Sequence, residues 1–591
     1  MKRFIVTAIC TSAYGFVFAQ TKPNTEKAKD TVKTEVVEVV SSYAPKVTDA
    51  FKIKRKPVIE LSKKVQRKPL DYKIKSVPVV STYIPKSGVL KGIDIGDRER
   101  LFNNYVALGF GNNTTPFVEG YFHNNSAFEY EYGGKINFIS STDPVADTRL
   151  NSGYYNASVD LFLKQEMRYY DWTAGFNAYR NKYNFYGLPE NINFIDPTVN
   201  SIDPSQTHKF YNIFGAVHFP DRDLQEIKGS VAYFSDTYES DELHADIDAL
   251  FEFPLGRFGL NLDDLKLATS INFINGGFAR TYNDPLVETN YGFATAGINP
   301  SYSFSYKKFD VKLGGKAYYS FDLENTEGKF FAYPDIEINH PIIKRYANIY
   351  GGITGDLEVN SYQGFTSRNP YVSPTLNITQ SSEALNVYGG FRGILSGNIN
   401  YDVKAGFKKE ENKALFLANP SNSNGTTNSF PGGVFFKGYD YGNSFGVVYD
   451  DVNTIYFSGG ITYDYSRHLN LGMNLEFNNY DLSTQAEAWN LPQLKSDVFA
   501  TYKKKDWYAS ANLYFVGGRK GTTYISGTPS VIDLDAYIDL NLDGGYHIND
   551  LFSVFLRANN ITNSNYQTFN NFNAQGIQVL GGIIYKFDAL F

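Results

Sequence analysis

The last eleven residues of the chain, 581–591, read GGIIYKFDALF and alternate strictly between two kinds of side chain. One set is apolar and aromatic and comprises Ile583, Tyr585, Phe587, Ala589 and Phe591; the other comprises Ile584, Lys586, Asp588 and Leu590. In a β-strand these two sets lie on opposite faces, and an apolar, aromatic face suits a strand that contacts lipid. The stretch therefore predicts the closing strand of a β-barrel that spans a membrane, where a sheet must have no open edge.

The same period of two recurs upstream. It is complete from residue 532 to 543 and is also clear in 506–515, 469–477 and 128–132. A soluble β-sandwich would alternate in the same way, but its strands are typically about five or six residues long. Runs of about ten suit tilted strands that cross a bilayer. We therefore expect an all-β fold, a large transmembrane antiparallel barrel over residues 104–591, with about 22 strands at roughly 22 residues per strand and connection.

Connections between these runs differ in length. The short ones, residues 548–550 and 503–505, are typical of periplasmic turns, and the long polar ones, 194–209, 281–291, 419–433 and 517–530, are typical of extracellular loops. The aromatic stretch 169–188 is expected to form an interface girdle and loop packing rather than a ligand platform. A polar strand face carrying Asp533, Asp535 and Asp539 is expected to line an acidic, solvated lumen.

The residues that usually carry chemistry are sparse and scattered. Seven histidines show no metal-ligand spacing, and the only cysteine is Cys10. His208 and His244 lie near loop-like segments and are expected to be surface residues. No nucleophile elbow or phosphate-binding loop occurs, so we expect neither an enzyme nor a cofactor or metal site.

The first residues have the pattern of a secretory leader. Lys2 and Arg3 precede an apolar core over 4–18, and Ala19 ends a small-residue cleavage site. We therefore expect residues 1–19 to be a signal peptide and the mature chain to be exported without cysteine.

Residues 20–103 form a segment of different character. Residues 21–100 carry 19 Lys and Arg against 10 Asp and Glu, although the whole chain has a net charge of −6. A VVS-x-Y-x-P-K motif occurs twice, as Val39, Val40, Ser41, Tyr43, Pro45 and again as Val79, Val80, Ser81, Tyr83, Pro85. These β-prone stretches are candidates for docking on a periplasmic or outer-membrane protein by edge pairing. A basic linker that fills an acidic lumen is the competing interpretation.

The end of the barrel region resembles a known family. Residues 533–587, with the run Asn559-Asn560-Ile561-Thr562-Asn563-Ser564-Asn565-Tyr566 before the closing strand, resemble the end of TonB-dependent receptor barrels, and residues 514–519 are similar to a preceding strand end. The aromatic end resembles the C-terminal signal of outer-membrane barrels, which implies that role for Tyr585, Phe587 and Phe591. The Tyr-, Phe- and Asn-rich style resembles proteins of Bacteroidota.

The resemblance has implications and one departure. It implies location in the bacterial outer membrane, contact with lipid, and binding or transport of an unknown solute. Residues 36–40 after Thr34-Glu35 resemble a TonB box, so TonB is a possible partner. The family's plug pattern does not occur in 20–102, so we expect a barrel that lacks the plug. The alternative function is a structural, non-transporting subunit of an envelope assembly, secretion or tethering complex; a nucleic-acid partner is not expected.

Overall fold

The computed structural model describes residues 101–125, 130–142, 144–220, 222–255 and 264–588. The predicted leader, the basic segment with its repeated motif, and Phe591 lie outside these residues.

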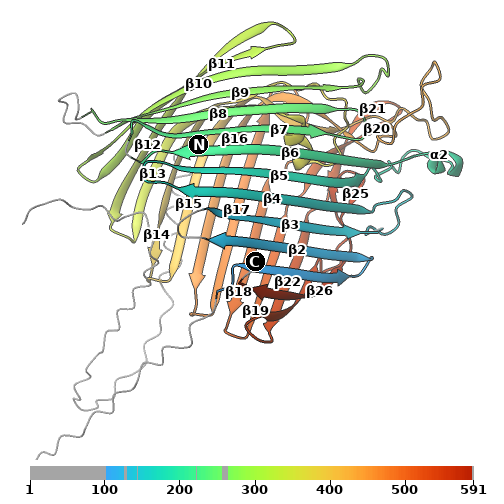
Figure 1. The fold of residues 1–591 in the computed structure, drawn as a ribbon. Helices are drawn as coiled ribbons and strands as arrows, with labels where there is room; N and C mark the ends of the chain where they lie inside the picture. Colours follow the sequence, from blue (N-terminus) through green and yellow to red (C-terminus); the bar gives the residue numbers. More distant parts are fainter. Residues whose placement is uncertain (1–100, 126–129, 143, 221, 256–263, 589–591) are drawn as a thin grey trace, which may run out of the picture. The chain divides into compact units, whose positions relative to one another are not determined.

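Most of the described chain is strand (Figure 1). The first wall strands are β1 (Asn104–Gly111), β2 (Thr115–Asn125), β3 (Glu131–Ser141), β4 (Tyr154–Glu166), β5 (Asp171–Asn184), β6 (Ser205–His218), β7 (Leu224–Ser235), β8 (Asp241–Phe253), β9 (Leu265–Phe278), β10 (Thr289–Tyr306) and β11 (Phe309–Asp322). The others are β12 (Glu327–Ile343), β13 (Ala347–Glu358), β14 (Ser381–Leu395), β15 (Ile399–Ala418), β16 (Phe445–Asp464), β17 (Leu469–Leu482), β18 (Leu494–Lys503), β19 (Trp507–Val516), β22 (Tyr537–His547), β23 (Phe552–Asn559) and β26 (Gln578–Phe587). Loops contain α2 (Asp196–Asn200), α3 (Tyr362–Arg368) and the hairpins β20 (Arg519–Ile525) with β21 (Thr528–Leu534) and β24 (Gln567–Phe569) with β25 (Phe572–Asn573).

The wall strands form one antiparallel sheet of 22 strands in which each strand pairs with the next wall strand along the chain. The sheet closes because β1 pairs with β26, in a register that runs from Asn104 opposite Phe587 to Gly111 opposite Leu580. The predicted barrel, its strand number and its closing strand are confirmed.

Successive side chains along each strand point alternately to the outer face of the wall and to the lumen. In β8, Ile247 is 54% exposed on the outer face. Its neighbour Asp246 lies on the other face, where it accepts hydrogen bonds from Ser230 and Asn272. In β26, Ile583 and Tyr585 are 51% and 41% exposed, as the sequence predicted. Apolar side chains exposed at alternate positions around a closed sheet form a lipid-facing surface. The protein is therefore a closed β-barrel with an outer surface suited to lipid.

A small apolar cluster covers the closing seam on the inside. Gly109 lies opposite Gly582, and a Cβ on Gly582 would meet the Phe555 ring and the Leu108 carbonyl oxygen. The Phe555 ring packs edge-on against Phe117, with the centroids 5.9 Å apart. Glycine at 582 thus lets an aromatic side chain lie flat over the junction of first and last strands.

The two ends of the barrel differ in their connections. An even number of strands puts the start of β1 and the end of β26 at the same end. At that end most turns are short, for example 307–308, 344–346 and 504–506. At the other end, where Figure 1 labels α2, β20, β21 and β25, several loops are long. Barrels of this kind direct short turns to the periplasm and long loops outward.

Four expectations need correction. Residues 532–543 are not one strand, because β21 ends at Leu534 and β22 begins at Tyr537; Asp533 belongs to a loop hairpin, where it pairs with Lys520 at 2.6 Å. The connection 517–530 accordingly contains two short strands rather than only loop. His208 is not a surface residue: it is buried in β6 with its ring 5.4 Å from that of Phe234. His244 is half-buried and lies 3.2 Å from Asp246.

Candidate functional site

The long loops meet one another over the mouth of the barrel. Tyr186 belongs to the β5–β6 loop, Tyr371 to the β13–β14 loop and Phe572 to the hairpin between β23 and β26. The rings of Tyr371 and Phe572 stack at 3.7 Å, and that of Tyr186 lies 5.8 and 5.1 Å from them. Loops that begin at three widely separated places around the ring can touch only by crossing the mouth. We call this meeting of loops the loop cap.

The β13–β14 loop, residues 359–380, reaches the wall at β7 to β9 through α3. Tyr362 and Phe365 have no exposed surface and lie in a cluster with Phe234, Ile274 and Phe278 from β7 and β9. Burial of this apolar surface is the main force that holds α3 against those strands.

Two buried carboxylates hold the start of α3 in place. Glu242 of β8 accepts hydrogen bonds from the Tyr362 amide at 2.6 Å, the Gln363 amide at 3.3 Å and the Tyr291 hydroxyl at 2.6 Å. Asp236, in the β7–β8 connection, accepts from the Tyr362 hydroxyl at 2.8 Å. Burial raises the pKa of Asp236, an effect opposed by the hydrogen bonds it accepts. Because these bonds are buried, they fix α3 to β7 and β8 more firmly than exposed bonds would.

A buried ion pair joins two further loops. Arg280, from the β9–β10 loop, makes hydrogen bonds to both carboxylate oxygens of Asp440, from the β15–β16 loop. Their side chains are 6% and 0% exposed. The guanidinium also donates to the Tyr439 hydroxyl at 2.9 Å and lies 5.2 Å from the Phe430 ring. A charged pair so deeply buried depends on both of its members being present.

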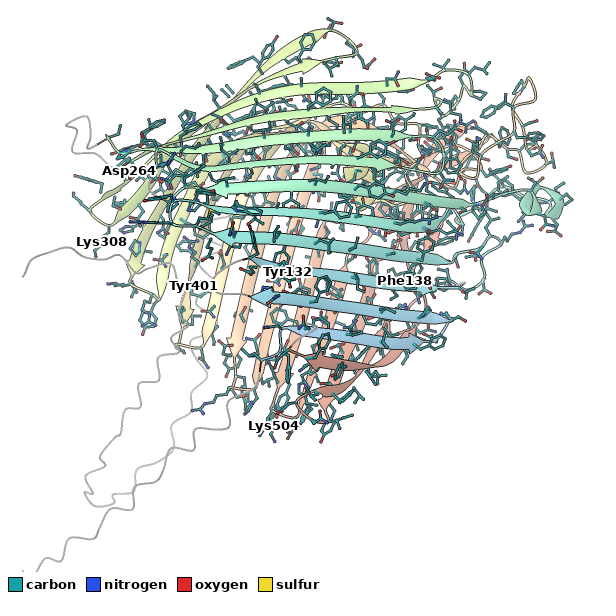
Figure 2. All side chains as sticks on the ribbon, viewed as in Figure 1. Tyr132, Phe138, Asp264, Lys308, Tyr401 and Lys504 are labelled. Atoms are coloured by element: carbon teal, nitrogen blue, oxygen red, sulfur yellow. The ribbon has the colours of Figure 1, made fainter. Side chains whose placement is uncertain are left out.

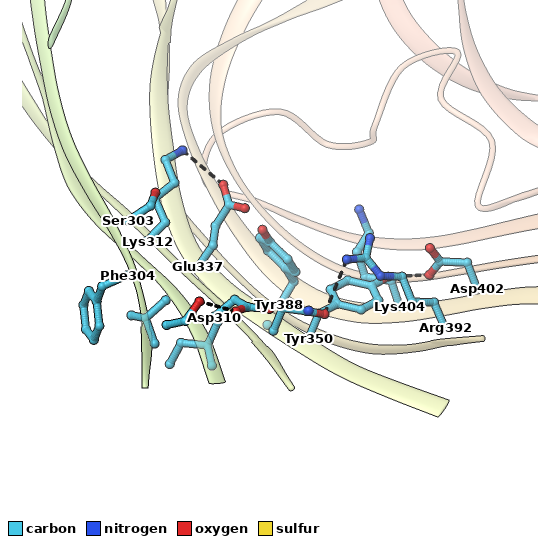
Figure 3. A pocket seen from close by; sticks show the side chains of 15 residues that line it. Ser303, Phe304, Asp310, Lys312, Glu337, Tyr350, Tyr388, Arg392, Asp402 and Lys404 are labelled. Carbon is cyan, nitrogen blue, oxygen red and sulfur yellow. Dashed lines mark hydrogen bonds and ion pairs between the residues drawn. The ribbon is translucent and has the colours of Figure 1, made fainter. Parts of the chain in front are cut away.

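Beneath the cap, the lumen wall carries a hollow of about 510 Å³ between β10 and β15 (Figure 3). Its charged and aromatic lining is Asp310, Lys312, Glu337, Tyr350, Tyr388, Arg392, Asp402 and Lys404. Lys312 pairs with Asp335 at 2.8 Å and Glu337 at 3.3 Å, and Tyr350 donates a hydrogen bond to Asp402. The Arg392 guanidinium lies 5.0 Å from the Tyr350 ring.

Two more hollows continue this one along the wall, and all three share Lys404. The second is also about 510 Å³ and adds Glu476, Lys495 and Asp497; the third is about 340 Å³ and adds Lys408, Glu410 and Lys413. The Lys404 ammonium lies 5.5 Å from the ring centroids of both Tyr388 and Tyr456. It forms no ion pair in the described part of the chain, so its charge is held by aromatic faces and is available to a ligand.

The charge of these hollows differs from the sequence-based expectation. The first hollow has three carboxylates, Asp310, Glu337 and Asp402, and three cations, Lys312, Arg392 and Lys404. The expected acidic lumen is wrong here, because lysines and arginines alternate with carboxylates on the same inward faces. Asp539 does line the barrel interior, where it accepts a hydrogen bond from Tyr566 at 2.7 Å.

In the described residues, no group of three or more His, Cys, Asp or Glu side chains is placed to hold a metal ion. No helix in the same residues is long and apolar enough to cross a membrane.

The predicted site residues have mixed outcomes. Tyr585 and Phe587 lie at the end of β26, where their rings stack 5.5 Å apart, and their role as an assembly signal stays a prediction. Tyr566, part of the motif that resembled a receptor barrel, stacks on Tyr537 at 3.8 Å. Lys404, Arg280 and Asp440 were missed. A lysine in a polar strand face gives no sequence signal by itself, but the aspartate of the β15–β16 loop lies among aromatics (YDY) that could have suggested burial.

Solved structures that are similar in fold to this chain include receptors of the outer membrane. The FrpB iron transporter from Neisseria meningitidis has a TM-score of 0.61 at 9% identity, with 83% of this chain and 82% of that chain covered. The pyoverdine outer-membrane receptor FpvA from Pseudomonas aeruginosa has 0.59 at 12%, with 83% and 79% covered. The chain has the barrel fold of TonB-dependent receptors.

A third receptor shares this barrel. The ferric enterobactin receptor PfeA from Pseudomonas aeruginosa has a TM-score of 0.58 at 11% identity, with 82% of this chain and 80% of that chain covered. No protein-family model matches the sequence, and no curated protein matches it significantly. Identities this low establish a shared fold; the structures compared are receptors and transporters rather than enzymes.

Proposed function

We propose that this barrel binds a polar solute on its lumen wall and passes it across the outer membrane. The observation that carries the proposal is the line of three hollows that meet at Lys404. A wall that served only as scaffold would need no connected hollows with unpaired cations and tyrosine faces. Small-molecule sites combine such concavity with a few placed polar groups.

The ligand chemistry follows from the lining. Carboxylates, ammonium and guanidinium groups, and tyrosine hydroxyls alternate over a short distance, so a ligand that offers both hydrogen-bond donors and acceptors would be bound best. Tyr350, Tyr388 and Tyr456 offer ring faces as well as hydroxyls. An apolar solute would leave these polar groups without partners and would be disfavoured.

The loop cap closes the mouth of the barrel in this structure. Passage from outside requires loops 359–380 and 419–444 to separate from the wall and from each other, since their buried residues cross the mouth. The cap would then control whether a solute can enter the lumen, and the wall below it would determine which solute is bound. The similarity in fold to siderophore and iron receptors supports uptake as the direction of passage.

The test is a native purification of the full chain from outer membranes, followed by mass spectrometry of the small molecules that stay bound. We expect a bound solute with wild type and its loss with Lys404→Gln. Lys520→Gln, in the exposed β20–β21 hairpin, is the matched control and should keep the solute. Equal small-molecule profiles for all three proteins would contradict a site at Lys404.

The same purification tests the alternative of a structural subunit. Under that alternative a fixed set of envelope proteins would co-purify in stoichiometric amounts, and no solute would depend on Lys404. The role of the repeated motif, with Tyr43 and Tyr83 as representative residues, stays a prediction. Its deletion should release a periplasmic partner, TonB or another, if the motif docks one.

A further inference from the structure

The short-turn end of the barrel carries an arc of basic residues. They lie in or beside the turns between β10 and β19 and comprise Lys307, Lys308, Lys344, Arg345, Arg467, Lys503, Lys504 and Lys505. We call these eight residues the basic rim. All are exposed, and Figure 2 shows Lys308 and Lys504 at the end opposite the long loops.

In the described turns from β10 to β19, carboxylates are few. They are Asp310, Asp464 and Asp506, and the first two already accept hydrogen bonds, from Ser305 at 2.7 Å and Asn470 at 2.6 Å. With Lys505 set aside, no member of the basic rim forms an ion pair in the described part of the chain. The arc therefore presents several unneutralised positive charges to its surroundings.

The other described turns at this end do not share this charge. The turn after β4 has Arg168 between Glu166 and Asp171, and the turn after β6 has Arg222 next to Asp223. Arg168 and Arg222 lie over aromatic rings of their own turns, at 5.3 and 5.6 Å, as Lys307 of the basic rim lies over Tyr306 at 5.1 Å, so only the neighbouring carboxylates distinguish the two arcs. The positive charge is thus one-sided around the ring as far as the structure describes it.

Exposed aromatic side chains fix the depth of the basic rim relative to lipid. Tyr306, Phe309, Tyr346, Tyr465 and Trp507 are exposed and adjoin the same turns. Trp507 stacks on Tyr502 at 4.5 Å. Aromatic girdles of barrels lie at the boundary between hydrocarbon and headgroups. Basic residues immediately beyond such a girdle lie at the level of lipid phosphates.

We propose that the basic rim binds anionic phospholipid headgroups of the periplasmic leaflet, of the phosphatidylglycerol type, along the arc from β10 to β19. The charge supplies attraction to the phosphates, and the aromatic side chains keep the turns at headgroup depth. A lipid suits this surface better than an acidic protein, because the cations follow the curved edge of the barrel next to its lipid-facing wall. The proposal is independent of solute passage.

The test is lipid selection by the purified full chain. Wild type is placed in mixed micelles with equal amounts of phosphatidylglycerol and phosphatidylcholine, and the lipids that remain bound are counted by native mass spectrometry. We expect phosphatidylglycerol to be enriched by roughly fivefold, and the enrichment to fall as salt rises. A matched pair of double variants locates the effect.

Lys344→Gln with Arg345→Gln removes two charges from the basic rim, and Arg168→Gln with Arg222→Gln removes two from the other arc. The first variant should lose at least half of the enrichment, and the second should keep it. Heat-dependent gel mobility confirms that both barrels are folded. Absence of enrichment in wild type, equal loss in both variants, or recovery of an acidic periplasmic protein in place of lipid would overturn the proposal.

Discussion

The loop cap and the lumen wall beneath it are built in opposite ways. In the cap, aromatic rings are fully buried, and an arginine and an aspartate pair out of reach of water. On the wall, charged groups are half-exposed around open hollows, and Lys404 has no carboxylate partner among the described residues. The cap has the composition of the core of a globular protein, whereas the wall has that of a binding surface.

This difference separates two tasks that one barrel must perform. Buried contacts among distant loops keep the mouth closed, so substitutions there should change stability and opening. Half-exposed groups on the wall are held by the strands themselves, so substitutions there should change binding with little effect on stability.

The largest effect is expected at the buried ion pair. Arg280→Ala leaves Asp440 charged and without its partner, which should destabilise the cap by about 3–5 kcal/mol. The measurement is amide hydrogen exchange of residues 419–444 in the detergent-solubilised protein. Lys520→Ala, which breaks the exposed pair with Asp533, should leave exchange unchanged. Unchanged exchange in both variants would show that the pair does not hold the cap.

A smaller effect is expected at α3. Tyr362→Phe removes the hydroxyl that donates to Asp236 and leaves a buried carboxylate short of one donor, at a cost of about 1–3 kcal/mol. Exchange of residues 359–380 should quicken more than that of 419–444. The control is Tyr306→Phe, an exposed tyrosine at the other end. The account fails if both substitutions have the same effect on 359–380.

The wall variant should show the reverse behaviour. Lys404→Met removes a cation but not a packed core residue, so thermal stability should change by less than about 0.5 kcal/mol. Ion selectivity in planar bilayers should shift toward cations, because carboxylates of the hollows then outnumber the cations. Reversal potentials under a salt gradient measure this shift. Equal selectivity of wild type and variant would place Lys404 away from the conducting path.

The smallest effect concerns pH. Burial raises the pKa of Asp236, so the folded cap holds this proton more tightly than the opened cap does. The resulting stabilisation is present below the ordinary aspartate pKa and is lost as the pH rises through the raised value. Protection factors of residues 359–380 should therefore fall modestly over that range, and Asp236→Asn should reduce the slope. A slope that is unchanged in Asp236→Asn would assign it to another group.

The sequence predicted the wall better than the cap, for a physical reason. In β26 and β17 the alternation is set by lipid on one side and water on the other, which is a local property of each strand. Residues 532–543 alternate in the same way, although the first of them belong to a loop hairpin and the later ones to a wall strand. A strand in either place has one apolar and one polar face. Period two therefore predicts strands but not which sheet they join.

Cap residues depend on contacts between distant parts of the chain. His208 is buried because α3, far along the sequence, folds over it with Tyr362. Arg280 and Asp440 look like ordinary loop charges until the two loops meet. Lys404 could not be singled out, since its two tyrosine partners come from the neighbouring strands β14 and β16. To identify these sites, the register of the barrel strands and the paths of the loops must be known.

The central claim is that the long loops form a folded core across the mouth, and hydrogen exchange of the full chain tests it most directly. The account predicts that amides buried in residues 359–380 and 419–444 exchange about as slowly as those of the adjoining strands β15 and β16. Exchange of both segments at the rate of free peptide, with the strands still protected, would contradict it.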